Sequence, residues 1–220
     1  MKNNNIITID GPSASGKGSL AKALAKELDF ILLDSGLLYR AYSYCYDHSK
    51  NHSLAMDLFS HLNIQSIDNV MHVFENEKDI TTILRHEDVA KLASEVSSFK
   101  ETRANLISFQ RDLASDQGLV ADGRDMGTVV FPDAKTKIFL VADAKVRAKR
   151  RFLELQNAGQ EVNMRDLIDD IRLRDEADEA REISPLMPAD DSIEVNSSNL
   201  TPQEVLGVVL KIYKEKTKEV

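Results

Sequence analysis

The chain has 220 residues, of which 42% are hydrophobic and 29% are charged, which is enough apolar content for one substantial core with a small insertion. Its formal net charge of −8 argues against a nucleic-acid-binding surface, although a local cluster of basic side chains can still bind a small anion. No apolar run approaches the roughly 18 residues that a membrane span requires, so we expect no membrane anchor.

A strand is expected over residues 6–10 and a helix over 17–28, with a glycine-rich loop between them. The loop reads G-P-S-A-S-G-K-G-S and comprises Gly11, Pro12, Ser13, Ala14, Ser15, Gly16, Lys17, Gly18 and Ser19. This order is typical of a phosphate-binding loop, because backbone N–H groups and the helix N-terminus then point at phosphate oxygens. Lys17 is expected to bridge the outer phosphates of a bound nucleotide.

The hydroxyl group that usually binds magnesium is displaced by one position in this loop. Gly18 follows Lys17, and the first hydroxyl comes at Ser19. This displacement argues against a direct contact between Ser19 and a metal. The order G-K-G-S resembles the variant of the loop found in nucleoside monophosphate kinases.

A second strand, over 31–33, precedes the string D-S-G-L-L-Y-R and a helix over 37–47. Gly36 suits a sharp turn between the two elements. Arg40 falls in the first turns of the helix, where a guanidinium group can make paired hydrogen bonds to a phosphate. A helix cap followed by a surface arginine explains the same letters equally well, so both interpretations stay open for this string.

The alternation of strands and helices is interrupted near residue 60. A helical pattern over 54–62 is followed by two strand-like runs, 64–68 and 70–75, with Asp-Asn at the turn. This pattern predicts a β-hairpin. We therefore expect roughly 60–90 to form a small inserted subdomain.

A later strand, over 119–121, is followed by the string D-G-R-D-M-G. Arg124 can hold a phosphate, and Asp125 can accept a hydrogen bond from an amine or amide. Asp122 closes the strand, as does the acid that orients magnesium in related loops. Turns rich in Asp and Gly are common, so the string alone is ambiguous.

The remaining elements continue the alternation. Helices are expected over 89–97, 102–114, 144–156, 164–180 and 202–213, and strands over 137–141 and 192–195. Short apolar strands separated by helices predict an α/β fold, a parallel sheet with helices on both faces. Ligands of such sheets bind at the carboxyl ends of the strands, which is where each string above falls. The charged end, K-E-K-T-K-E-V, is the one tail that we expect.

Arginines are dense on the two helical patterns before the last strand. They are Arg147, Arg150 and Arg151 on the first pattern, and Arg172, Arg174 and Arg181 around Asp178 on the second. Positions 174, 178 and 181 share one helical face. A solvated face with weak ion pairs would have this composition too. So many arginines in an acidic chain, with Gly159 as a hinge, favour instead a lid over 147–181 that closes on phosphates.

Two observations bear on the compartment. Residues 1–5 contain no apolar signal region before the first strand, and Cys45 is the only cysteine, so no intramolecular disulfide is expected. Cys45 lies in an apolar and aromatic stretch and is expected to pack in the core. We expect a cytoplasmic protein.

These strings together resemble the bacterial cytidylate kinases, which have the nucleoside monophosphate kinase fold of the P-loop NTPases. The resemblance rests on G-P-S-A-S-G-K-G-S, L-L-D-S-G-L-L-Y-R, A-D-G-R-D-M-G-T-V-V-F-P-D-A, K-I-F-L and the pattern R-x-R-D-x-x-D-x-x-R over 172–181. It extends from end to end and includes the inserted hairpin. The string D-G-R-D-M-G-T-V-V-F-P is far more specific than the phosphate loop.

The resemblance implies phosphoryl transfer from ATP to CMP and dCMP, with Mg²⁺ bound as Mg-ATP. We expect a monomer, and the net charge and the lack of a long apolar run predict that it binds neither nucleic acid nor membrane. The chain is expected to form one kinase domain over 1–220, in which the insertion at 60–90 binds the monophosphate and the helices at 147–181 form the lid.

The resemblance also assigns roles residue by residue. The acceptor phosphate is expected at Ser35, Arg40, Arg124 and Arg181, the cytosine at Ser94, Arg103 and Asp125, and the ribose at Arg174 and Asp178, with Tyr39 also against CMP. ATP is expected at Gly11–Ser19, the lid arginines are Arg147, Arg150 and Arg151, and Mg²⁺ is expected near Asp122 and Ser19 through water. The expected catalytic residues are Lys17, Arg124, Arg151 and Arg181.

Two other functions would use similar residues. One is a kinase for another acceptor, such as AMP or shikimate. The other is a non-enzymatic nucleotide switch or an ATP-dependent assembly factor. Several phosphate-binding arginines from separate segments favour a second anionic substrate over a switch.

Overall fold

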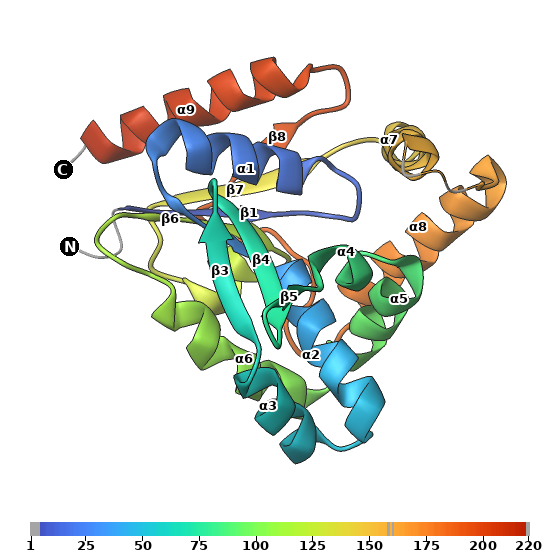
Figure 1. Ribbon diagram of the computed structural model, residues 1–220. Coiled ribbons are helices and arrows are strands. Elements are labelled where there is room, and N and C mark those ends of the chain that lie inside the picture. Colours follow the sequence, from blue (N-terminus) through green and yellow to red (C-terminus); the bar gives the residue numbers. More distant parts are fainter. Residues whose placement is uncertain (1–4, 158, 160, 219–220) are drawn as a thin grey trace.

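The computed structural model describes residues 5–157, 159 and 161–218 (Figure 1). Its centre is a parallel sheet with the strand order β2-β6-β1-β7-β8. The strands are β1 (Ile6–Asp10), β2 (Ile31–Asp34), β6 (Leu119–Gly123), β7 (Thr136–Val141) and β8 (Ile193–Asn196). All five were expected from the sequence, and every residue of β1 is buried because the sheet is covered on both faces. The predicted α/β fold is confirmed.

Helices cover the two faces of the sheet (Figure 1). On one face lie α1 (Lys17–Leu28) and α9 (Pro202–Lys218), and on the other lie α2 (Ser35–Ser49) and α6 (Lys100–Asp112). Alternate residues of β1 enter opposite cores: Ile7 and Ile9 pack with α1 and α9, whereas Ile6 packs with α2. Cys45 is buried in the second of these cores, as expected.

The helix after β2 begins two residues earlier than predicted. Asp34 caps it, because its carboxylate accepts a hydrogen bond from the backbone N–H of Leu37 at 2.9 Å. Ser35 is therefore the first helical residue, and Gly36 lies inside the first turn of α2. The expected sharp turn at Gly36 was wrong.

The expected hairpin is present as β3 (Asn63–Ile67) and β4 (Val70–Glu75). Asp68 and Asn69 both have positive φ, as a two-residue hairpin turn of type I′ requires. The Asn69 side chain donates to the carbonyl oxygens of Ala25 and Phe30, at 3.0 and 3.2 Å, and so fastens the tip of the hairpin beside the end of α1.

Three short elements here were not expected from the sequence: a third strand, β5 (Lys78–Asp79), the helix α4 (Thr81–Leu84), and a π-helical segment, η2 (Met126–Val130), after β6. The helix α3 (His52–Ser60) precedes the predicted insertion, and α5 (Glu87–Val96) overlaps its end. Whether 60–90 acts as a subdomain of its own stays a prediction.

The last helices lie at the margin of the molecule. Figure 1 shows α7 (Ala144–Asn157) and α8 (Met164–Glu179) beyond the carboxyl ends of the strands. The expected charged tail was wrong as far as Lys218, because α9 continues to that residue, and its last turn is held by a hydrogen bond from Thr217 Oγ1 to the carbonyl oxygen of Tyr213 at 2.8 Å. Residues 219–220 lie outside the described residues. Among the described residues, no helix combines the length and the apolar character of a membrane span.

The surroundings of two glycines predict that the same substitution, Gly→Ala, lowers stability at one position and raises it at the other. Gly118 has a φ of +104°, and a Cβ there would lie 2.6 Å from the ring of Phe30, whereas Gly207 in α9 has open space around it. Gly118→Ala should lower the free energy of unfolding by on the order of 2 kcal/mol through strain and the clash with Phe30. Gly207→Ala should raise it by about 0.5–1 kcal/mol, since alanine is the better helix former. Urea unfolding of both variants and the parent tests this, and the reverse ranking would contradict the described packing.

Candidate active site

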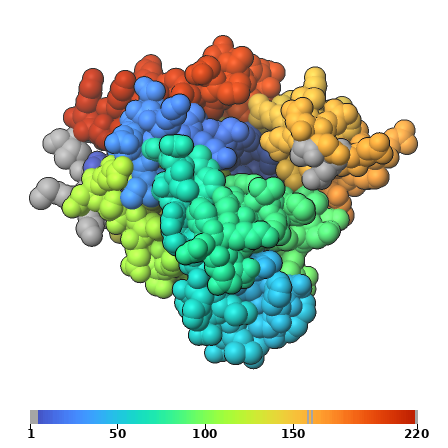
Figure 2. Space-filling view, viewed as in Figure 1, coloured from blue at the N-terminus to red at the C-terminus, as the bar shows by residue number. Residues whose placement is uncertain are grey.

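A cleft of about 460 Å³ opens at the carboxyl ends of the strands. Figure 2 shows a recess there, between α1, the α4–α5 region and α7. The predicted residues that line it are Ser13, Ala14, Gly16, Lys17, Gly18, Ser19, Ser35, Tyr39, Arg40, Ser94, Arg103, Asp122, Arg124, Asp125, Arg151, Arg174, Asp178 and Arg181. Residues far apart in the chain therefore meet in one cleft. Gly11, Pro12, Ser15, Arg147 and Arg150 were also predicted but do not line it.

The phosphate loop connects β1 to α1 along one side of the cleft. Gly11 has a φ of +148°, and a Cβ there would lie 2.1 Å from the carbonyl oxygen of Leu140, so only glycine fits. Lys17 is buried, and its Nζ donates to the carbonyl oxygen of Pro12 at 2.8 Å. Burial, with the nearby charge of Arg124, lowers the pKa of Lys17 to about 7. The negative charge of a bound phosphate would favour the protonated, charged form of Lys17.

Two of the three arginines expected in the lid hold α7 against the phosphate loop. Arg147 Nη1 donates to the carbonyl oxygen of Ser13 at 3.1 Å, and Arg150 Nη1 donates to that of Ser15 at 2.9 Å. Arg151 alone of the three reaches the cleft, where it pairs with Glu87 of α5 at 2.5 Å. Arg147 and Arg150 are therefore bound to the phosphate loop itself, whereas Arg151 lines the cleft opposite α5.

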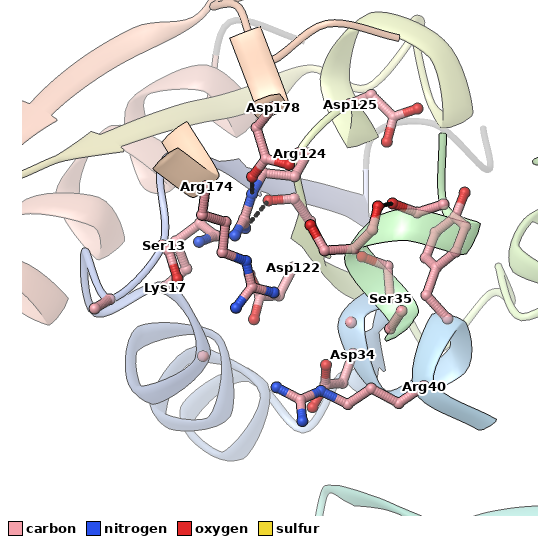
Figure 3. A pocket seen from close by; sticks show the side chains of 18 of the residues that line it. Ser13, Lys17, Asp34, Ser35, Arg40, Asp122, Arg124, Asp125, Arg174 and Asp178 are labelled. Carbon is pink, nitrogen blue, oxygen red and sulfur yellow. Dashed lines mark hydrogen bonds and ion pairs between the residues drawn. The ribbon is translucent and has the colours of Figure 1, made fainter. Parts of the chain in front are cut away.

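Two carboxylates stand side by side at the ends of neighbouring strands. Asp34 of β2 is in register with Asp122 of β6. Figure 3 shows Asp122 with Arg124, Asp178 and Arg174 on one side of it and Asp34 and Arg40 on the other. Burial raises the pKa of Asp122 to about 6, although Lys17 opposes the shift. Among the described residues, no group of three or more His, Cys, Asp or Glu side chains forms a site for a metal ion. Oxygen donors of this number suit a Mg²⁺ ion that keeps waters and arrives with phosphates.

Asp178 is the buried centre of an arginine cluster. Its carboxylate accepts a hydrogen bond from Arg124 Nε at 2.8 Å and forms an ion pair with Arg181 Nη2 at 2.5 Å. Burial would raise the pKa of Asp178, but Arg124 and Arg181 outweigh burial and hold the pKa below its ordinary value. Arg174 also borders the cleft, and its Nε is buried without a hydrogen-bond partner among the described residues. One carboxylate thus faces three guanidinium groups. The cluster therefore carries a net positive charge that a bound anion would neutralise.

Arg40 and an unpredicted arginine, Arg85, line the opposite wall. Arg40 Nη1 donates to the carbonyl oxygen of Leu84 at 3.1 Å, and burial together with Arg174 lowers its pKa to about 10. Arg85 Nη2 donates to Asp34 at 3.0 Å. Arg85 follows the four-residue helix α4, which has no periodicity strong enough to signal a functional residue.

A third group of side chains forms a polar pocket beside Tyr39. Arg103 pairs with Asp125, lies 5.6 Å from the centre of the Tyr39 ring, and donates to the carbonyl oxygen of Ser97 at 3.3 Å. Burial raises the pKa of Tyr39 to about 12, so its hydroxyl stays protonated. The pocket thus presents a carboxylate and a guanidinium group next to an aromatic ring.

Sequence reasoning missed several residues that line the cleft: Lys22, Asp34, Arg85, Ala93, Ser97, Gly123 and Glu154. Asp34 stands inside a quoted string, but its role as a helix cap hid its position beside Asp122. Ser97 is recognised as a cleft residue only from its tertiary contact, because its hydroxyl accepts a hydrogen bond from Arg181 Nη2 at 3.0 Å. No local pattern marks it.

Comparison with known proteins places the chain in a family. The family model described as cytidylate kinase matches residues 7–215. The cytidylate kinase of Mannheimia succiniciproducens is 42% identical and covers 99% of this chain and 100% of its own length. That of Pseudomonas putida strain W619 is 44% identical, with 91% and 92% covered, and cytidylate kinase 1 of Haemophilus influenzae is 43% identical, with 93% and 91% covered. The chain belongs to the cytidylate kinase family.

Proposed function

We propose that this chain transfers the γ-phosphoryl group of ATP to CMP, and also to dCMP, inside the cleft. The observation that carries the proposal is the arrangement of cations in two groups. Lys17 in the phosphate loop forms one group, and Arg124, Arg174 and Arg181 around Asp178 form the other. Two anionic groups brought together by one cleft are what a transfer between two nucleotides requires.

The donor nucleotide is assigned to the loop Gly11–Ser19. Its backbone N–H groups and Lys17 neutralise the β- and γ-phosphates, and Arg151 stands across the mouth from them. Asp122, Asp34 and Ser19 would hold Mg²⁺ through water together with the phosphates of ATP, and the ion would supply neutralisation of the phosphate charge. The oxygen-only donor set at the ends of β2 and β6 supports this assignment.

The acceptor is assigned to the other group of cations. Ser35, Arg40, Arg124 and Arg181 hold its phosphate, Arg174 and Asp178 contact its ribose, and Ser94, Arg103 and Asp125 contact its base, with Tyr39 beside them. The acceptor is already an oxyanion near neutral pH, so no strong general base is needed. The protein's contribution is to hold the two phosphates in line and to stabilise the charge that spreads over the transferred group.

The helices over 147–181 act as the lid, and the insertion over 60–90 as the part that receives the monophosphate. Closure has to exclude water, because water would otherwise accept the phosphoryl group. We place the reaction in the cytoplasm and in a monomer without nucleic acid. ADP release measured with and without CMP, dCMP, UMP, AMP and shikimate tests the function. Release that does not depend on any acceptor would point to a switch instead.

Lys17→Ala should abolish turnover in a folded protein. We expect kcat to fall by at least about a hundredfold, the scale for the loss of one preorganised electrostatic group. Lys26→Ala is the matched control, because Lys26 is exposed on the same helix. Steady-state kinetics and thermal unfolding of both variants decide, and near-normal kcat in Lys17→Ala would remove Lys17 from catalysis.

Arg181→Ala should raise KM for CMP far more than KM for ATP. Losing a charge-assisted hydrogen bond costs on the order of 1.5–3 kcal/mol in binding. Arg181→Lys should restore little, since lysine lacks the planar fork of donors. Arg172→Ala, an exposed position on α8 outside the cleft, is the control. Equal changes in both KM values would contradict the placement of Arg181 at the acceptor.

Asp125→Ala should reduce the preference for CMP over UMP. A carboxylate accepts from the amino group of cytosine and repels the carbonyl group that uracil has in its place. Removing the carboxylate should therefore cost CMP about 1–3 kcal/mol of interaction free energy. Asp133→Ala, on the exposed segment after η2, is the control. The measurement is kcat/KM for CMP, UMP and AMP. An unchanged CMP/UMP ratio would exclude Asp125 from base recognition.

A further inference from the structure

One buried carboxylate near the cleft has no part in the mechanism above. Asp10, the last residue of β1, is 5% exposed and forms no ion pair within the described part of the chain. An unpaired buried carboxylate is unfavourable unless hydrogen bonds compensate for it. The hydrogen bonds that compensate for the burial of Asp10 therefore indicate what this residue does.

The Asp10 carboxylate holds a segment 116 residues away in the chain. Its two oxygens accept from the backbone N–H groups of Met126 at 2.9 Å and Gly127 at 2.8 Å. These are the first residues of η2, whose initial N–H groups have no partner inside the helix. Arg111 holds the other end of η2 by donating to the carbonyl oxygens of Val129 and Val130, each at 2.9 Å. Side chains of opposite charge thus fix both ends of this short segment.

The residue immediately before the two amides is Asp125. Its side chain is buried and pairs with Arg103, which lies over the Tyr39 ring. The carbonyl group of Asp125 also accepts from the backbone N–H groups of Val129 and Val130, at 2.9 and 3.1 Å. Both the C=O and the N–H of the peptide group that joins Asp125 to Met126 are therefore hydrogen-bonded. Tilting the peptide after Asp125 would turn its carboxylate away from Arg103.

We propose that Asp10 is a positioning residue for base selection: its two main-chain hydrogen bonds to Met126 and Gly127 hold the Asp125 carboxylate at the angle that distinguishes cytosine from uracil. The inference rests on the proposed function, because it assigns a determinant of the specificity of that same site. Asparagine would not replace Asp10, since its single oxygen satisfies one amide and its NH₂ group faces the other.

The test compares Asp10→Asn with Thr8→Val in the intact enzyme. Thr8 precedes Asp10 by two residues on the same face of β1, and its buried hydroxyl has no partner among the described residues. Asp10→Asn should lower the CMP/UMP ratio of kcat/KM by about fivefold, the scale of one lost hydrogen bond, and Thr8→Val should leave it unchanged. The charge lost near Lys17 affects donor binding alike for both acceptors, so the ratio isolates the effect on the base.

A double-mutant cycle separates this role from a structural one. If Asp10 acts through Asp125, Asp10→Asn should not change the CMP/UMP ratio further in an Asp125→Ala background. The same reduction in both backgrounds, or a fall in kcat/KM that is equal for CMP and UMP, would overturn the inference. Where Asp10→Asn does not fold, Asp10→Glu serves, because one extra methylene displaces both amides and should lower the ratio in the same direction.

Hydrogen exchange of the wild-type enzyme adds a readout without turnover. The amides of Met126 and Gly127 should exchange slowly, and fast exchange would overturn the inference. A wild-type preference for another monophosphate would overturn the proposed function and the inference with it. CMP preference in the wild type with an unchanged ratio in Asp10→Asn would overturn the inference alone.

Discussion

The pairing of Asp178 with two arginines is the interaction on which the rest of the cleft depends. Its carboxylate is buried, yet Arg124 and Arg181 keep its pKa below the ordinary value. Without these two partners, the buried carboxylate would carry the full cost of desolvation. The pair with Arg124 joins the turn after β6 to α8, 54 residues further along the chain, so the same contact that satisfies the charge also assembles the site.

Positive charge nevertheless exceeds negative charge around this centre. Burial and the neighbouring Arg124 lower the pKa of Lys17 to about 7, and burial with Arg174 lowers that of Arg40 to about 10. Both shifts mean that the charged forms are disfavoured when no anion is present. A bound phosphate would reverse them, since an opposite charge favours the protonated form. Ligand binding should therefore stabilise the fold as well as complete the site.

Local patterns predicted the strands, the hairpin turn and the phosphate loop, because burial, glycine geometry and turn chemistry act over a few neighbouring residues. Asp68 and Asn69 illustrate this, since their positive φ follows from the turn itself. Partners distant in the chain were not predictable in this way. Spacing identified Arg147 and Arg150 as functional candidates, but it did not identify the carbonyl groups of the loop residues Ser13 and Ser15 that they bind. Arg85 and Ser97 enter the cleft only through tertiary packing, which leaves no periodic mark in the sequence.

The attachment of the hairpin tip has a mechanical consequence. The Asn69 side chain donates to the carbonyl groups of Ala25 and Phe30, so the hairpin tip is attached to the end of α1 and to the residue before β2. A rotation of the predicted insertion about that attachment would displace most the parts that lie farthest from it. Those parts are α4 and α5, which carry Arg85 and Ser94 into the cleft. A small change of angle at the hairpin would thereby become a larger displacement of Arg85 and Ser94, two side chains that line the cleft.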